Sequence, residues 1–181
     1  MSVKYYDWTA YHANMRGNKV AIIDLDTRNE LTYAQLDQRA ERLAAWLQSQ
    51  GVTKGDRVAL LTPNCPEVFE AEFACAKIGA ICIPLNWRLT VPELEYILND
   101  STPKVLIFDQ TFSEQAVALQ DLCSFAHTLE VAIENASSSY ELALSGADEK
   151  CEAIECTHDD VAMIMYTCLL YTSDAADDLL C

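Results

Sequence analysis

Short apolar runs alternate with amphipathic segments along most of the chain. Runs of strand length lie at residues 20–24, 57–61, 80–84, 104–108 and 128–133. Segments with an apolar face at helical spacing lie at residues 33–50, 66–78 and 112–122, and a further one runs from Thr90 to Leu98 or Asn99. Strands and helices in alternation predict βαβ units, and therefore an α/β fold with a mostly parallel sheet and helices on both faces.

Capping signals mark where these helices begin and end. Thr32 is followed three residues later by Gln35, and Thr90 by Glu93, which makes two capping boxes. Gly79 supplies a stop for the helix that precedes it, because glycine adopts the left-handed conformation of a helix C-terminus at little cost. These signals strengthen the helical interpretation.

The pattern weakens in the last third of the chain. A Ser-rich and acidic stretch follows residue 134, and only a short helix at 140–144 is expected in it. One more apolar strand is expected at 161–166, and it leads into Thr167. Residues 168–181 match nothing that precedes them.

Composition and charge narrow the function classes. The chain has 181 residues, 51% hydrophobic and 22% charged, which is typical of one globular domain with a hydrophobic core. Its formal net charge of −16 argues against nucleic-acid binding, which needs clustered Lys and Arg. Neither a transmembrane helix nor a signal peptide is expected, since apolar stretches of the required length are absent. The scattered cysteines, without a C-x-x-C pair, favour a reduced, cytoplasmic protein.

Other side-chain groups suggest chemistry only weakly. Cys151, Cys156 and His158 could form a zinc site, but structural zinc normally takes four ligands, and this C-x₄-C spacing has no partner pair. A nucleophilic cysteine assisted by His12, His127 or His158 has no supporting motif. The sequence therefore predicts no metal site and no catalytic residue.

Several motifs, in order, carry a family resemblance. They are LTYAQL at 31–36, GVTKGDRVA at 51–59, AKIGA at 76–80, PLNWRLT at 84–90 and ELEYILNDS at 93–101. Together they resemble the N-terminal region of adenylate-forming enzymes, the superfamily of acyl-CoA synthetases, nonribosomal adenylation domains and firefly-type luciferases. The segment at 86–90 is most similar to bacterial fatty-acyl or aryl-acyl-CoA ligases. The resemblance extends over about residues 18–167, so 1–167 is identified as an incomplete N-terminal AMP-binding-type domain.

The resemblance implies a reaction and its cofactors. Members of the family use ATP and Mg²⁺ to join a carboxylate to AMP, and a thiol such as coenzyme A then takes the acyl group. In them, the strand that matches 161–167 leads into a Ser/Thr/Gly-rich loop ending in Pro-Lys-Gly, which holds the phosphates. Here Tyr166 and Thr167 match the start of that loop, and Thr167 is the one residue expected to contact a phosphate. ATP, Mg²⁺ and coenzyme A are therefore not expected to bind well to this chain, which we expect to be inactive.

Residues 168–181 are interpreted separately from the rest of the chain. Cys168–Asp177 back-translates, with permitted codons, to a string that resembles a transposase-type sequencing adapter. We therefore interpret 168–181 as a non-native tail. The rival interpretation is a natural acidic C-terminus.

Three functions remain open at this stage. The first is a fragment of an ATP-dependent acid–CoA ligase whose substrate is a fatty acid or a similar carboxylate. The second is an adenylation domain that loads a carrier protein. The third is a small non-catalytic binding protein.

Overall fold

The computed structural model describes residues 7–132 and 135–167. Its main sheet contains four parallel strands in the order β4-β3-β5-β6. The strands are β3 (Arg57–Leu61), β4 (Ile81–Pro84), β5 (Val105–Asp109) and β6 (His127–Val131). The helices that connect or cover them are α2 (Tyr33–Ser49), α3 (Pro66–Ile78), α4 (Val91–Ser101), α5 (Ser113–Leu122) and α6 (Ser139–Gly146), with a 3₁₀ turn, η1 (Gln110–Phe112), before α5.

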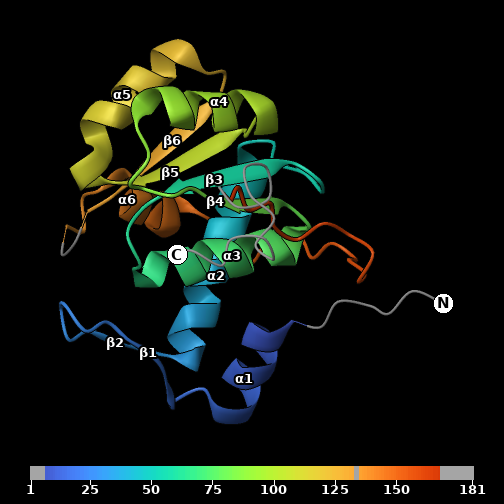
Figure 1. The fold of residues 1–181 in the computed structure, drawn as a ribbon. Coiled ribbons are helices and arrows are strands. Elements are labelled where there is room, and N and C mark those ends of the chain that lie inside the picture. Colours follow the sequence, from blue (N-terminus) through green and yellow to red (C-terminus); the bar gives the residue numbers. More distant parts are fainter. Residues whose placement is uncertain (1–6, 133–134, 168–181) are drawn as a thin grey trace, which may run out of the picture.

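The helices cover both faces of the sheet, as the sequence predicts. α4 and α5 lie on one face, and α2, α3 and α6 lie on the other (Figure 1). The α/β class and the mostly parallel sheet are therefore confirmed. Both predicted capping boxes are present, since the side chains of Gln35 and Glu93 accept hydrogen bonds from the backbone amides of Thr32 and Thr90.

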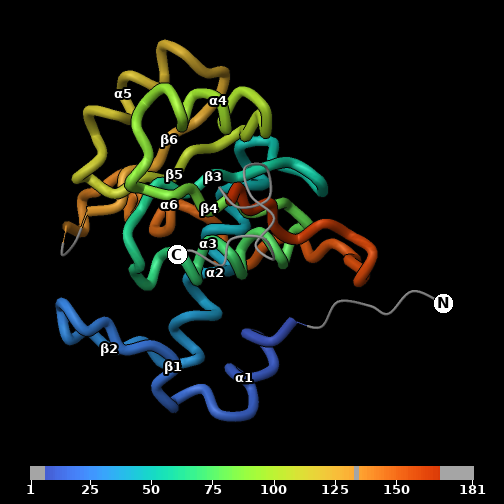
Figure 2. Tube along the Cα trace, in the orientation of Figure 1, coloured from blue at the N-terminus to red at the C-terminus, as the bar shows by residue number. Residues whose placement is uncertain are grey.

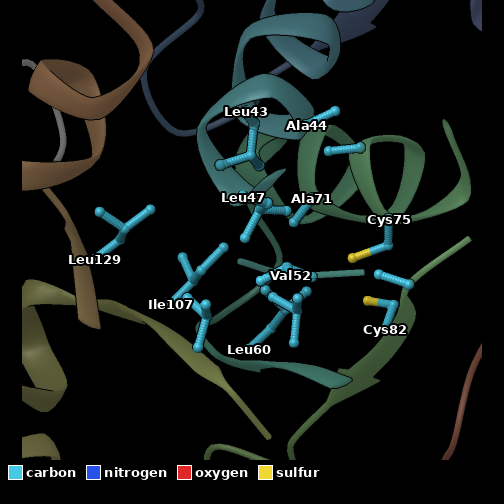
Figure 3. Packing of buried hydrophobic residues seen from close by; sticks show 14 of the residues in the cluster. Leu43, Ala44, Leu47, Val52, Leu60, Ala71, Cys75, Cys82, Ile107 and Leu129 are labelled. Carbon is cyan, nitrogen blue, oxygen red and sulfur yellow. The ribbon is translucent and has the colours of Figure 1, made fainter. Parts of the chain in front are cut away.

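Each face of the sheet has its own hydrophobic core. The core under α2, α3 and α6 includes Leu43, Leu47, Val58, Ile78 and Ile107, all at most 1% exposed. Figure 3 shows part of this core, where Leu47 and Ala71 from the helices lie over Val52, Leu60 and Ile107. The second core packs α4 and α5 against the opposite side chains of the same strands, which alternate between the two faces.

The N-terminal part differs from the prediction. The run at 20–24 forms β1 (Val20–Ile23), but it pairs antiparallel with β2 (Glu30–Thr32) as a separate two-stranded sheet. The intervening turn is closed by a hydrogen bond from the Asp24 amide to the Asn29 carbonyl, so the chain reverses locally instead of crossing to the main sheet. A helix that the sequence pattern does not reveal, α1 (Trp8–Arg16), packs against α2 beside this hairpin (Figure 2).

The strand expected at 161–166 is present only in part. Met163 forms an isolated parallel bridge with Cys82 of β4, through hydrogen bonds from the Cys82 amide to Ala162 and from the Ile164 amide to Cys82. Beyond Ile164 the backbone leaves β4, and Tyr166 instead donates from its hydroxyl to Asp100 of α4 at 2.5 Å. Side-chain packing on an adjacent helix thus replaces further strand pairing.

Candidate functional site

The order of the strands creates a crevice at the carboxyl ends of β3 and β5. From β3 the chain crosses through α3 to β4 on one side, and from β5 it crosses through α5 to β6 on the other. Because these connections leave on opposite faces, the space between the two strand ends stays open, and ligands of open α/β sheets bind at such a point. A cavity of about 430 Å³ lies there, and Pro63, Asn64 and Asp109 are in its lining.

The charge of this crevice does not suit a nucleotide phosphate. Among the described residues, its lining holds one guanidinium, that of Arg39, and the carboxylates of Asp24, Asp26, Glu67, Glu70, Asp109 and Glu141. Phosphate groups need basic side chains or free backbone amides, which this set of side chains does not supply. The crevice is therefore an acidic surface that does not fit ATP with the residues present.

A partly buried ion-pair network lines one wall of the crevice. Arg39 on α2 donates from Nε to Glu70 of α3 at 2.5 Å, and through its two terminal nitrogens to Glu141 of α6 at 2.5 and 3.1 Å. The hydroxyl of Tyr140 donates to the other oxygen of Glu70 at 2.8 Å. Burial raises the pKa of Glu70, against the opposing charge of Arg39. With both oxygens bonded, Glu70 joins three helices and is not placed to transfer protons.

Cys65 also lies at the crevice, immediately before α3. Burial, together with the charge of Glu67, raises the pKa of its thiol to about 12. A thiol with this pKa is almost entirely protonated at neutral pH and is a poor nucleophile. Covalent catalysis by Cys65 is thus disfavoured.

A second ionic cluster lies beneath α1. The ammonium of Lys77, on α3, is only 3% exposed and donates to Asp7 at 2.8 Å, to Asp37 at 2.8 Å and to Glu41 at 3.0 Å. Burial lowers the pKa of Lys77, but the hydrogen bonds to these carboxylates outweigh it, and the pKa lies above its ordinary value. This cluster joins α1 and α2 to α3.

The same three carboxylates have the spacing of a cation site, since one oxygen from each lies within 4.8 Å of the others. The Lys77 ammonium contacts all three, so the positive charge that they require is already supplied by the protein. The residues present therefore do not fit Mg²⁺ at this position. The pattern of the sequence does not indicate this cluster, because its members come from distant parts of the chain.

The other candidate groups are placed apart from one another. Cys151 donates from its thiol to Glu41 at 3.3 Å, whereas the Cys156 thiol lies 3.9 Å from the Ala76 carbonyl. In the described part of the chain, these two cysteines and His158 are not among the side chains that converge as metal ligands. His12 stacks with Trp8 and lies tilted against Tyr33, and His127 packs edge-on to Trp46.

Thr167, the residue expected to contact a phosphate, is exposed and is the last described residue. It follows the segment that bridges to β4. Whether its hydroxyl contacts a phosphate stays a prediction. Trp87 and Arg88, which follow β4, pack on each other, with the guanidinium carbon 4.1 Å from the ring centroid.

Comparison with known proteins decides the family. Residues 9–168 match the AMP-binding enzyme family. The chain belongs to this family. The resemblance drawn from the ordered motifs is therefore confirmed, and the fold agrees with it.

Individual relatives are acyl-CoA ligases. The chain is 38% identical over 160 residues to a feruloyl-CoA synthase of Amycolatopsis sp, covering 88% of this chain and 30% of the relative. It is 38% identical over 147 residues to the long-chain-fatty-acid–CoA ligase FadD13 of Mycobacterium tuberculosis (strain ATCC 25618 / H37Rv), covering 81% of this chain and 29% of the relative. The chain thus spans about 30% of the length of these relatives.

Solved structures agree with these relatives. The inhibitor-bound N-terminal domain of FACL13 from Mycobacterium tuberculosis superposes with a TM-score of 0.81 at 32% identity, covering 92% of this chain and 42% of that one. The anthranilate CoA ligase AuaEII in complex with anthranoyl-AMP gives a TM-score of 0.82 at 26% identity, covering 92% and 32%. The sheet and helices described above are therefore those of acyl-CoA ligase N-terminal regions.

Proposed function

We propose that this chain is the N-terminal part of an ATP-dependent acid–CoA ligase whose substrate is a fatty acid or a similar carboxylate. The observation that carries the proposal is the match of residues 9–168 to the AMP-binding enzyme family, with CoA ligases among the relatives. The parent would use ATP, Mg²⁺ and coenzyme A. A cytoplasmic location belongs to the same proposal, because ATP and coenzyme A are its co-substrates.

The chain itself is proposed to be inactive. Neither the acidic crevice at β3 and β5 nor the cluster around Lys77 fits a nucleotide or its metal ion. Thr167 would contribute one hydroxyl to a phosphate-binding loop in the parent, where small residues and backbone amides surround the phosphates. One hydroxyl without those amides does not bind a triphosphate.

An exchange assay tests the inactivity. The purified 181-residue chain is incubated with ATP, Mg²⁺, labelled pyrophosphate and a panel of aromatic and fatty carboxylates. We expect no carboxylate-dependent incorporation of label into ATP. Exchange that depends on one of the acids would contradict the proposed inactivity while supporting the ligase family.

We further propose that residues 168–181 are foreign to the protein. Their back-translation to an adapter-like string supports this proposal, as does the family match, which ends at residue 168. The test is to amplify and read the source DNA across codon 167. Continuation into a Ser/Thr/Gly-rich loop ending in Lys-Gly is expected, whereas a genomic stop after codon 181 would overturn both this proposal and the ligase function of this product.

A second candidate differs in the acyl acceptor. The chain is 38% identical over 104 residues to a fatty acid–[acyl-carrier-protein] ligase, ScoC, of Streptomyces coeruleorubidus. This relative favours an enzyme that loads a carrier protein. Assaying the full-length parent with coenzyme A and with a phosphopantetheinylated carrier protein, each as the only acceptor, separates the two candidates.

A further inference from the structure

Two buried thiols face each other between α3 and β4. Cys75, in the last turn of α3, and Cys82, in β4, are each 1% exposed and belong to the same hydrophobic core. Their sulfur atoms lie side by side in Figure 3, and the two thiols are hydrogen-bonded to each other. Neither cysteine is in a disulfide. The two residues lack the spacing of a C-x-x-C motif, so the fold and not a sequence motif brings them together.

The backbone between the two cysteines is fixed. Gly79 ends α3 in the left-handed conformation, with φ +68°, and the Ala80 amide then donates to the Cys75 carbonyl at 2.9 Å. β4 therefore begins directly beside the end of the helix that carries Cys75. A disulfide needs sulfur atoms about 2.05 Å apart and Cβ atoms that point toward each other. Two thiols already in contact across a tight turn come close to this requirement.

The thiols are covered by a segment from the C-terminal part of the described chain, residues 151–164, called here the covering segment. The Cys82 amide donates to the Ala162 carbonyl at 3.0 Å, and the Ile164 amide donates to the Cys82 carbonyl at 3.0 Å. Ile154 and Met163 pack against the core that contains both cysteines. The covering segment therefore separates the thiols from solvent.

In the closed arrangement the thiols are unreactive. The hydrogen bond with Cys82, together with burial, raises the pKa of the Cys75 thiol well above its ordinary value of 9.0. The attacking species in thiol–disulfide exchange is the thiolate, which such a pKa suppresses at neutral pH. Reaction at this pair therefore requires the covering segment to open.

The covering segment is held mainly by exposed side chains. Its residues form no helix, and its pairing with β4 is one isolated bridge. Lys54 donates to the Glu155 carbonyl at 3.1 Å and to Asp160 at 2.7 Å, and these two side chains are 40% and 33% exposed. Exposed ion pairs contribute little to stability, so this segment opens at a lower free energy than the sheet beneath it.

We propose that Cys75 and Cys82 are a redox site, which low-molecular-weight disulfides convert to an intramolecular disulfide when the covering segment opens. One cysteine loses its proton to water, and its thiolate attacks a sulfur of the small disulfide and displaces one small thiolate. The second cysteine is deprotonated in turn, attacks the protein sulfur of the mixed disulfide and displaces the other small thiolate.

The electron balance of this exchange is closed. The two cysteine sulfurs are oxidised, the small disulfide is reduced to two thiols, and the two cysteine protons pass through water to those thiols. The site is independent of the proposed ligase activity, because the exchange needs only residues of this chain.

Peptide mapping in a glutathione redox buffer tests the proposal. The folded 181-residue chain is equilibrated with reduced and oxidised glutathione, and the remaining thiols are blocked with iodoacetamide in denaturant. Cleavage after Lys, Arg and Glu places Cys65, Cys75 and Cys82 in different peptides, so a linked pair is identified by its mass. We expect the linkage between Cys75 and Cys82 to exceed the glutathione adducts at these two positions by about tenfold, because the second thiol is held beside the first.

Three results would overturn the redox site. One is a predominance of glutathione adducts at Cys75 and Cys82, and another is the absence of any reaction there. The third is the same mixture of pairings in urea as in buffer, since in urea we expect Cys65 and Cys123 to share in the linkages. Cys123 packs in the core on the opposite face of the sheet and is the internal control, expected to form only the glutathione adduct when the chain is folded.

Variants test the pairing and the opening separately. C82A should leave Cys75 with no linkage, whereas C123A should leave the linkage of Cys75 to Cys82 unchanged. K54M removes the ion pair with Asp160 and should speed formation of the linkage about two- to fivefold. K19M, at an exposed lysine outside the covering segment, is the matched control and should react at the wild-type rate. Equal rates for K54M and K19M would overturn control by the covering segment.

Discussion

The hydroxyl of Tyr140 donates a hydrogen bond to Glu70 across 2.8 Å, and both side chains are 1% exposed. The two residues are 70 positions apart in the chain, on α6 and α3. The bond supplies a partner for a buried carboxylate oxygen that has no access to water. It therefore connects the last helix of the structure to the centre of the α2–α3 layer.

Replacing Tyr140 by phenylalanine should destabilise the fold. The ring still fills its space, but one oxygen of Glu70 loses its donor, and an unsatisfied buried acceptor costs about 1–3 kcal/mol. The measurement is the free energy of unfolding in urea. Y96F is the matched control, because Tyr96 is 70% exposed, and its substitution should change stability by less than about 0.5 kcal/mol. Equal effects of the two variants would contradict the role of the Tyr140 hydroxyl.

Lys77→Met should be more damaging than Tyr140→Phe. The substitution leaves the carboxylates of Asp7, Asp37 and Glu41 facing one another without their shared cation. Breaking a buried ion pair by removing one partner typically costs about 3–5 kcal/mol. Urea unfolding of K77M at pH 7 checks this value, with the exposed Lys19→Met as control. A loss no larger than that of K19M would show that the cluster is not stabilising.

The same cluster predicts how stability depends on pH. Burial raises the pKa of Asp7 and Glu41, but the hydrogen bonds and charge of Lys77, together with hydrogen bonds from backbone amides, lower it more in sum, so both pKa values lie below their ordinary 3.8 and 4.5. Such groups stabilise the fold above those ordinary values, and the contribution is lost as the pH falls through the lower folded pKa values.

Unfolding free energies measured from pH 7 down to pH 3 should therefore fall steeply below about pH 4.5 in the wild type. In K77M this acid-dependent loss should shrink. Without the ammonium the carboxylates repel one another, so their protonation stabilises the fold instead of destabilising it. Parallel pH profiles for the two proteins would rule out the linkage.

Gly79→Ala should destabilise the fold through two separable effects. The residue has φ +68°, and an added Cβ would lie 2.9 Å from both the Cys156 Sγ and the Lys54 Cγ. Gly51, with φ +78° and open space around it, has the conformational effect without the contact. We expect G51A to cost about 1–2 kcal/mol, the usual cost of the left-handed conformation for a residue with a Cβ.

G79A should cost more than G51A, and the difference measures the contact with residues 54 and 156. Thermal melts of both variants provide the comparison. If G79A and G51A are equally destabilised, the packing of the segment that carries Cys156 against the end of α3 is not significant for stability.

Local sequence signals predicted the central α/β unit well. The strands from β3 to β6 and the helices α2 to α5 lie within a few residues of their expected positions, because each combines a hydrophobic period with a cap or turn. α1 was missed, since it lacks a clear apolar face and is anchored by Asp7 and Thr9 through tertiary hydrogen bonds to Lys77 and Asp37. The pairing of β1 with β2 was missed because β2 has only three residues.

The two ionic clusters, by contrast, could not be predicted from the sequence. Nothing in the spacing of Arg39, Glu70 and Glu141 along the chain indicates that they meet, and the same is true of Lys77 and its carboxylates. In the sequence pattern, these charged residues look the same as charged residues on a solvent-exposed helix face. Only the packing of α2, α3 and α6 on one face of the sheet brings their charges within hydrogen-bond distance.

The sequence by itself determined the alternation of strands and helices, the positions of the caps and the membership of the AMP-binding enzyme family, because these depend on short-range periodicity and on ordered local motifs. The tertiary structure alone decided where buried charges are neutralised. The physical reason is that burial and ion pairing depend on which helix faces meet, and that choice is made by the packing of the whole domain.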